Sequence, residues 1–191
     1  VSIEGAIGRG WSRYESGSDT LRRLSIDLYW STKLDARWRL QVSNRLDVVR
    51  PQTDASATNS LRELYVGWQD ASGGWAFDAG RINLRQGPAL AYNPTDFFRD
   101  GSIRVATTVN PLLVREYRLG SVMLRGQRLW SDGSVSLAVS PKLESEPSRA
   151  GASADLGSTN NRIRAMASLG TQWSDKVNTQ LHLYQENGSR R

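Results

Sequence analysis

The chain has 191 residues without cysteine and with one histidine, His182, which excludes disulfides, thiolate metal sites and multi-histidine zinc sites. Its formal charge is +6 and its pI about 10.0, so nucleic acid, an anionic membrane surface or anionic solutes are possible partners. The mean hydropathy is −0.51, and no apolar run approaches the ~20 residues of a transmembrane helix. A transmembrane barrel stays compatible, because its strands alternate in polarity. The start at Val1, without Met or a signal peptide, indicates a processed chain or a fragment.

Polar and apolar residues alternate with a period of two along most of the chain, which is typical of β-strands with one apolar face. In residues 21–30, Leu24, Ile26 and Leu28 alternate with polar neighbours. Strong alternation also covers 37–49, 134–140, 161–173 and 176–186, and weaker alternation covers 2–14, 61–69, 75–84 and 115–130. The pattern predicts an all-β protein of about nine strands without a long helix.

The predicted connections fall into two classes that alternate after the first hairpin. Those near 33–36, 70–74, 131–133 and 174–175 are short and rich in turn residues, whereas those at 49–60, 85–113 and 141–160 are long. This alternation of short and long connections is not expected in a soluble β-sandwich. It is expected in an outer-membrane barrel, because the periplasmic turns of such barrels are short and their outer loops are long.

Six of the seven tryptophans flank the short turns, at one end of the predicted strands. They are Trp30, Trp38, Trp68, Trp75, Trp130 and Trp173. Indole rings favour the membrane–water boundary, so these residues are predicted to form a periplasmic aromatic girdle. In a soluble sandwich they would instead be core anchors, which should not prefer short turns.

Strand parity predicts a larger assembly. Bacterial single-chain barrels have even strand numbers, and nine strands would leave the last one ending at the outer surface. Residues 1–191 are therefore predicted to be the N-terminal part of one antiparallel, up-and-down barrel domain of roughly 16–18 strands. The expected location is the bacterial outer membrane, with its lipid as a partner and a homo-oligomer possible.

The long connection 85–113 has features of an ordered loop. Phe97 and Phe98 supply apolar anchors, and Pro88 and Pro94 restrict the backbone. It is predicted to pack on the barrel or to fold into its lumen. Candidate residues lining the pore or its constriction are Arg37, Arg39, Arg45, Asp47, Arg85, Asn93, Asp96, Arg99 and Arg104. Rings of arginine with few acids select anions, although Arg–Asp pairs that only stiffen the wall are an equally open interpretation.

A sequence pattern in this region adds a resemblance. It runs from Gly80-Arg81 through Gly87 to Asn93-Pro94-Thr95-Asp96, and then to the segment REYRLG at 115–120. This pattern resembles Gram-negative outer-membrane porin-like barrels, and is distantly similar to alginate-export-type barrels. The resemblance implies passage of a solute or polymer across the outer membrane. The predicted function is thus a channel for small or polymeric anionic solutes, including polysaccharide, without a cofactor, metal or enzymatic activity.

Several alternatives stay open. The barrel could be a plugged envelope scaffold or a secretion or export partner. A barrel-embedded hydrolase would need partners for His182, or two carboxylates among Glu63, Asp78 and Glu116 that meet across the lumen. Nucleic-acid binding suits the charge, but the basic residues spread over many strands instead of forming one patch. Asn93, Asp96 and Asp100 do not have the spacing of an EF-hand calcium loop.

Overall fold

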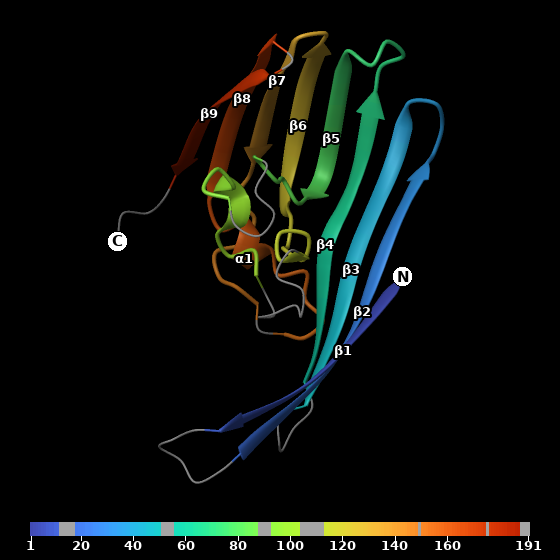
Figure 1. Cartoon of the computed structure of the whole chain (residues 1–191), viewed down its shortest axis with the longest axis vertical. Coiled ribbons are helices and arrows are strands. Elements are labelled where there is room, and N and C mark those ends of the chain that lie inside the picture. The colour runs from blue at the N-terminus through green and yellow to red at the C-terminus, as the bar shows by residue number, and fades with distance from the viewer. Residues whose placement is uncertain are drawn as a thin grey trace.

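The computed structural model describes residues 1–11, 18–50, 56–87, 93–103, 113–148, 150–174 and 176–187. In these residues nine antiparallel strands form one curved sheet in which each strand pairs with its neighbours in the chain (Figure 1). The strands are β1 (Ser2–Trp11), β2 (Ser18–Lys33), β3 (Trp38–Arg50), β4 (Ser56–Gln69), β5 (Trp75–Ile82), β6 (Ser121–Trp130), β7 (Gly133–Ser140), β8 (Ile163–Ser174) and β9 (Val177–Asn187). A 3₁₀ turn, η1 (Phe97–Arg99), and one short helix, α1 (Leu156–Thr159), complete the described elements.

The prediction of about nine up-and-down antiparallel strands is confirmed, whereas a closed barrel is not shown. β1 and β9 are the edge strands of the described sheet and do not pair with each other, so the described strands do not close into a barrel. The strands form a single sheet, whereas a β-sandwich packs two sheets face to face.

Polar and apolar residues alternate with a period of two in these segments. This pattern favours strands, because successive side chains of a strand point to opposite faces of the sheet. In β2, Arg23, Ser25 and Asp27 are buried on the concave face of the sheet. Leu24 and Ile26, on the opposite face, are 46% and 38% exposed. In β3, Gln41, Ser43, Arg45 and Asp47 are buried in the same way, so these two strands turn their polar side chains inward.

The connections 83–120 and 141–162 at one end of the sheet are long, but the connection predicted to be long at 49–60 spans only 51–55, because β3 extends to Arg50 and β4 begins at Ser56. Short turns join β2 to β3, β4 to β5, β6 to β7 and β8 to β9 at the upper end in Figure 1. In the first of them the Asp35 carboxylate accepts hydrogen bonds from the backbone N–H groups of Arg37 and Trp38, at 2.6 and 2.9 Å. In the second, the Asp70 carboxylate accepts one from the N–H of Trp75 at 2.9 Å. Local side-chain caps of this kind fix tight turns.

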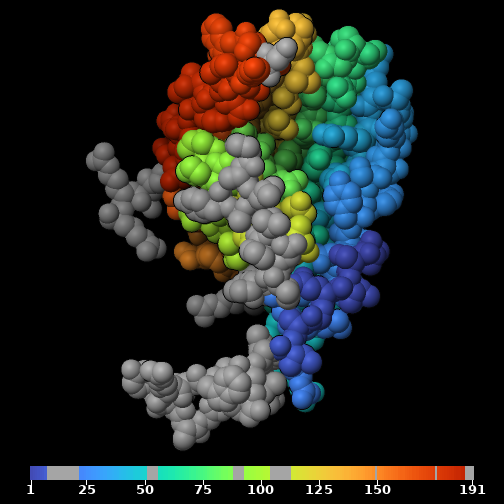
Figure 2. Space-filling view, viewed as in Figure 1, coloured from blue at the N-terminus to red at the C-terminus, as the bar shows by residue number. Residues whose placement is uncertain are grey.

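The described parts of the two longest connections, 83–120 and 141–162, lie on the concave face, where Figure 2 shows them over β4–β8. A small apolar cluster lies between them and the sheet; it comprises Ile82, Leu84, Phe98, Met123, Ala138 and Met166. Phe97 stacks on Tyr184 of β9, with ring centroids 4.9 Å apart. The described part of the 85–113 loop therefore packs on the concave face of the sheet.

One strand boundary differs clearly from the expectation. The weak alternation at 115–130 predicted one strand, but β6 begins only at Ser121. Arg115 and Arg118 are drawn into the inward-folded connection, where both guanidinium groups bind Asp96. The backbone N–H of Gly120 then donates to the Arg62 carbonyl at 2.8 Å, which ends the connection at the sheet.

Candidate functional site

The interior of this protein is polar. Among the described residues, 23 buried residues are polar or charged and only seven are hydrophobic. The opposite face exposes large aliphatic side chains, including Leu124 at 67%, Leu137 at 56% and Leu183 at 65%. This distribution is the reverse of that in water-soluble domains, in which buried positions are mostly apolar.

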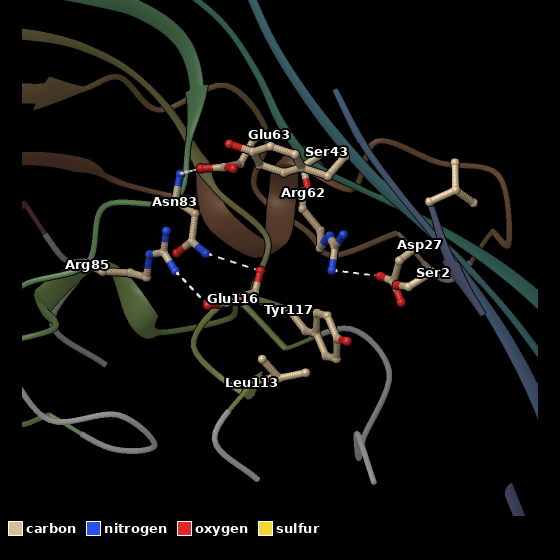
Figure 3. A pocket seen from close by; sticks show the side chains of 12 residues that line it. Ser2, Asp27, Ser43, Arg62, Glu63, Asn83, Arg85, Leu113, Glu116 and Tyr117 are labelled. Atoms are coloured by element: carbon tan, nitrogen blue, oxygen red, sulfur yellow. Dashed lines mark hydrogen bonds and ion pairs between the residues drawn. The ribbon is translucent and has the colours of Figure 1, made fainter. Parts of the chain in front are cut away.

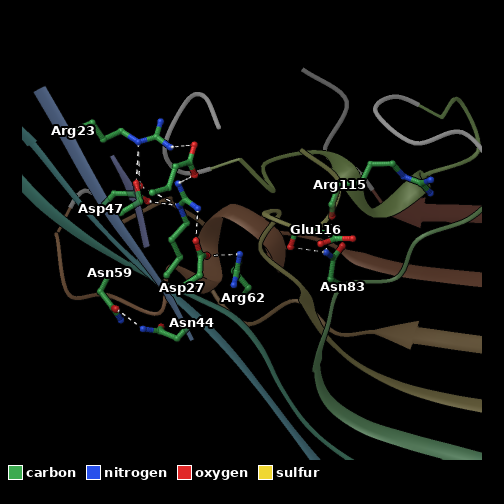
Figure 4. A network of polar contacts seen from close by, with 12 residues as sticks. Arg23, Asp27, Asn44, Asp47, Asn59, Arg62, Asn83, Arg115 and Glu116 are labelled. Carbon is green, nitrogen blue, oxygen red and sulfur yellow. Dashed lines mark hydrogen bonds and ion pairs between the residues drawn. The ribbon is translucent and has the colours of Figure 1, made fainter. Parts of the chain in front are cut away.

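Six charged residues from four adjacent strands form a buried cluster on the concave face, which we call the four-strand ion cluster. Its members are Glu4, Arg23, Asp27, Arg45, Asp47 and Arg62 (Figure 4). Arg45 is its centre, because it donates to Asp27 at 2.6 Å, Glu4 at 3.0 Å and Asp47 at 3.1 Å. Three arginines thus face three carboxylates, and the charges balance. Each of these arginines therefore has a carboxylate partner and is not a free cation on the concave face.

Tyr117 connects this cluster to the inward-folded connection. The guanidinium carbons of Arg45 and Arg62 lie 4.2 and 4.9 Å from the centroid of its ring. Cation–π contacts of this geometry are favourable and are strengthened by desolvation. Burial raises the pKa of the Tyr117 hydroxyl, so the ring stays neutral at physiological pH.

Asp96 joins two parts of the connection 83–120, because its carboxylate binds Arg115 and Arg118. Its carboxylate is 1% exposed and accepts hydrogen bonds from Arg115, Arg118 and the Gln86 backbone N–H, all at 2.7 Å. Burial alone would raise the pKa of Asp96, but the hydrogen bonds from Arg115, Gln86 and Arg118 outweigh burial and hold this pKa below its ordinary value. We call this arrangement the Asp96 anchor.

Acidification is expected to release the Asp96 anchor only at strongly acidic pH. Because the folded-state pKa of Asp96 is depressed, its contribution to stability is present above the unfolded value of about 3.9 and is lost as pH falls through the folded pKa. Hydrogen exchange of residues 93–103 between pH 7 and pH 2 measures this release. Loss of protection at pH 5 to 6 would contradict the assignment. An Asp96→Asn variant, unprotected already at neutral pH, serves as the reference.

The second long connection is fixed to the sheet by an amide and an arginine. The side chain of Asn160 donates to the Val122 carbonyl and accepts from the Val122 N–H, both at 2.9 Å. Arg81 of β5 donates to the Gly120 carbonyl at 2.8 Å and reaches Thr159 at 3.4 Å. One arginine therefore contacts both connections, and the two are braced against the same strands.

A cavity of about 520 Å³ lies between the four-strand ion cluster and the connection 113–120 (Figure 3). Arg85 and Glu116 face each other at its edge at 3.7 Å, with their side chains 45% and 57% exposed. On its wall, Glu63 accepts from the Asn83 N–H at 3.2 Å, and the Asn83 side chain donates to the Arg115 carbonyl at 2.8 Å. The cavity thus offers exposed groups of both signs to a polar solute.

The predicted pore-lining residues fall into distinct environments. Arg45 and Asp47 meet in the four-strand ion cluster. Arg39 faces the concave side, 53% exposed, and donates to Asp78 at 3.0 Å. Arg37 lies in the exposed turn between β2 and β3, because the strand that was predicted from residue 37 begins at Trp38.

The pore-lining candidates in the 85–113 loop also lie in different environments. Asp96 is the buried anchor, and Asn93 is buried, where its side chain accepts from the hydroxyl of Thr95 at 2.7 Å. Arg85 reaches the cavity, and Arg99 is exposed. Arg104 lies outside the described residues.

Sequence reasoning missed most partners of these residues. Arg23 shares the inward parity of Ser25, so alternation could have identified it as a partner. The alternation of β4 carries less information, because an irregularity in the β3–β4 register leaves Arg62 without a register partner in β3. Arg115 and Arg118 lay inside a segment predicted to be a strand. No local signal indicates that they bind Asp96.

The six tryptophans lie beside the short turns, as expected from their positions in the sequence. Trp38 and Trp68 are cross-strand partners, and Trp75 stacks on Phe77 with centroids 6.0 Å apart. Trp130 is 44% exposed and Trp173 is 73% exposed. Exposed aromatic rings therefore line one end of the sheet.

One serine–histidine contact bears on the hydrolase alternative. Ser168 Oγ lies 2.9 Å from Nδ1 of His182, and the Phe97 ring packs edge-on against the imidazole at 6.2 Å. A catalytic triad also needs a carboxylate that orients the histidine. Among the described residues, no carboxylate contacts His182.

Neither a metal site nor a comparison with known proteins indicates a function for this chain. The described residues contain no group of three or more His, Asp or Glu side chains that could hold a metal ion. In the same part of the chain, no helix is long and apolar enough to cross a membrane. The chain matches no protein-family model, no curated protein and no solved structure.

Proposed function

We propose that this chain forms part of the wall of an outer-membrane β-barrel channel that passes anionic solutes along its concave face. The distribution of polarity carries this proposal: charged side chains are buried on the concave face, while Leu124, Leu137 and Leu183 are exposed on the other. Lipid would cover the aliphatic face, and water or solute would contact the polar one. The tryptophans beside the short turns would form the periplasmic girdle.

The edges of the sheet support a larger barrel. All neighbouring strands are antiparallel, so β1 and β9 run in the same direction and cannot pair with each other in antiparallel fashion. An odd number of further strands would close the sheet. A whole of roughly 16 to 18 strands satisfies this condition.

The exposed arginines would provide the anion preference. Arg45 is neutralised within the four-strand ion cluster, whereas about half of the Arg85 and Arg39 side chains is accessible from the concave side. The inward-folded connections would narrow the pathway beside these two residues. Fixed positive charges at a constriction lower the barrier for anions.

Charge reversal at Arg85 tests this pathway. In planar bilayers under a KCl gradient, the full-length protein is expected to conduct with a preference for chloride. Arg85→Glu should shift the reversal potential toward cations, because it changes the local charge by two units beside Glu116. Arg37→Glu, with the same charge change in the exposed turn, is the control and should shift it much less. Equal shifts in both variants, or none, would contradict an arginine-lined constriction.

A plugged scaffold is the second candidate. It is favoured by the Asp96 anchor and the Asn160 contacts, which hold both long connections on the concave face. A plugged barrel would show no conductance in the wild type, and substitution of Asp96 would open it. An open channel would conduct before the substitution, and only its conductance level would change.

A further inference from the structure

Two arginines occupy an unusual place on the aliphatic face of the sheet. Arg22 of β2 and Arg50 of β3 are direct cross-strand partners, and both are exposed. Side-chain alternation places Arg22 on the same face as Leu24, and Arg50 on the same face as Val48. This arginine pair lies toward the end of β2 and β3 away from the six tryptophans that flank the short turns.

The pair lacks a counter-charge in the described part of the chain. Like charges directly opposite each other on neighbouring strands destabilise the pairing. Among the described residues, neither Arg22 nor Arg50 forms an ion pair, unlike Arg23, which joins the four-strand ion cluster from the other face. An anion bound between the two guanidinium groups would remove the repulsion.

A groove of about 590 Å³ runs beside the pair. Arg22, Arg50, Leu24, Val48, Ile7 and Gly5 line it. A Cβ atom added at Gly5 would meet nothing within 4 Å, so the groove is open there. The site thus combines an aliphatic floor with a cationic rim.

The spacing along β2 relates this site to the proposed membrane. Arg22 and Trp30 enclose Leu24, Ile26 and Leu28 on the exposed face. At roughly 3.3 Å per residue, the distance from Arg22 to Trp30 is about 26 Å along the strand. With the strand tilt of ~35–45° in outer-membrane barrels, this corresponds to roughly 20 Å of their ~25 Å apolar band. The tryptophan would therefore lie near one boundary of that band, and the arginine pair near the other.

We infer that Arg22 and Arg50 bind the phosphate of an anionic membrane lipid whose acyl chain lies in the groove over Leu24 and Val48. Guanidinium groups match phosphate oxygens in bidentate geometry, and the aliphatic floor matches a hydrocarbon chain. This inference rests on the proposed function, because it needs the aliphatic face to contact lipid.

Lipid selectivity of the full-length protein tests the inference. The protein is folded into phosphatidylcholine vesicles that contain phosphatidic acid, and spin-labelled analogues of the two lipids report their relative affinities. The wild type should prefer phosphatidic acid. The double variant Arg22→Gln/Arg50→Gln should lose this preference by roughly tenfold, because two charge-assisted contacts disappear. The control Lys33→Gln/Arg37→Gln removes the same charge near the opposite end of the strands and should retain the preference.

Each outcome has a definite meaning. Equal selectivity in the wild type and the double variant would overturn the lipid site, and so would displacement of phosphatidic acid by inorganic phosphate alone. Arg22→Gln alone provides a milder variant, which should lose part of the preference. Membrane insertion is recorded separately, as heat-modifiable migration in electrophoresis. Failure to insert would refute the proposed function itself, whereas insertion without lipid preference would refute only this inference.

Discussion

Replacing Leu137 by arginine is expected to lower the free energy of unfolding of the membrane-folded protein by about 2–4 kcal/mol, the cost of a charge on the lipid face near the bilayer midplane. Leu137 lies in the middle of β7 and is 56% exposed. In a water-soluble protein, substitution at so exposed a position usually changes the stability by less than about 0.5 kcal/mol. The same substitution therefore separates a lipid-facing leucine from a solvent-facing one.

Urea titration of the full-length protein in phosphatidylcholine vesicles, followed by tryptophan fluorescence, measures this difference. Ser131→Arg is the matched control, because it introduces the same side chain in the exposed turn between β6 and β7. It should leave the stability nearly unchanged. If Leu137→Arg were as harmless as the control, the aliphatic face would not contact lipid.

Asp96→Asn is expected to release the connection 83–120 from the concave face and to cost about 3–5 kcal/mol, the usual effect of breaking a buried ion pair from one side. The substitution keeps the shape of the side chain but removes its charge. Arg115 and Arg118 would then be buried without their shared carboxylate, which now accepts from both at 2.7 Å. Urea titration gives the cost, and limited proteolysis between residues 93 and 103 reports the release.

Asp100→Asn is the control for this experiment. Asp100 lies four positions along the same segment, but its side chain is 69% exposed, and its ion pair among the described residues is with Arg162 at 3.7 Å. Exposed pairs of this kind contribute at most about 1 kcal/mol. Similar losses in the two variants would mean that the Asp96 anchor does not hold the connection.

The strand architecture could be predicted from the sequence because strand periodicity is local information. The alternation of Leu24, Ile26 and Leu28 with polar residues identified β2, and the turn residues around 70–74 separated β4 from β5. The position of the tryptophans followed from the same turns. Burial then matched the alternation, with the unusual result that the polar face is inside.

The inward network could not be predicted in the same way, because its contacts join residues far apart in the chain. Asp27 and Arg62 come from different strands, and Tyr117 reaches them from a connection. The sequence predicted Arg45 as a pore-lining cation. In the structure, Glu4, Asp27 and Asp47 neutralise it, which shifts the proposed anion contacts to Arg39 and Arg85.

Closure into the proposed barrel would need strands besides β1 to β9, and the periodicity within β1 to β9 carries no information on such strands. The number of strands predicts only whether the number of further strands needed for closure would be odd or even. The central prediction is therefore about the surface of the wall, namely that its aliphatic face and its tryptophan end contact a bilayer.

Quenching of tryptophan fluorescence by brominated phospholipids tests that prediction most directly. The full-length protein is folded into vesicles whose lipids carry bromine either near the headgroup or near the chain end. Exposed rings such as Trp130 and Trp173 would lie at the membrane boundary, so bromine near the headgroup is expected to quench more strongly than bromine at the chain end. Absence of quenching at either depth, with the protein folding and unfolding cooperatively in buffer without lipid, would contradict a membrane-spanning wall.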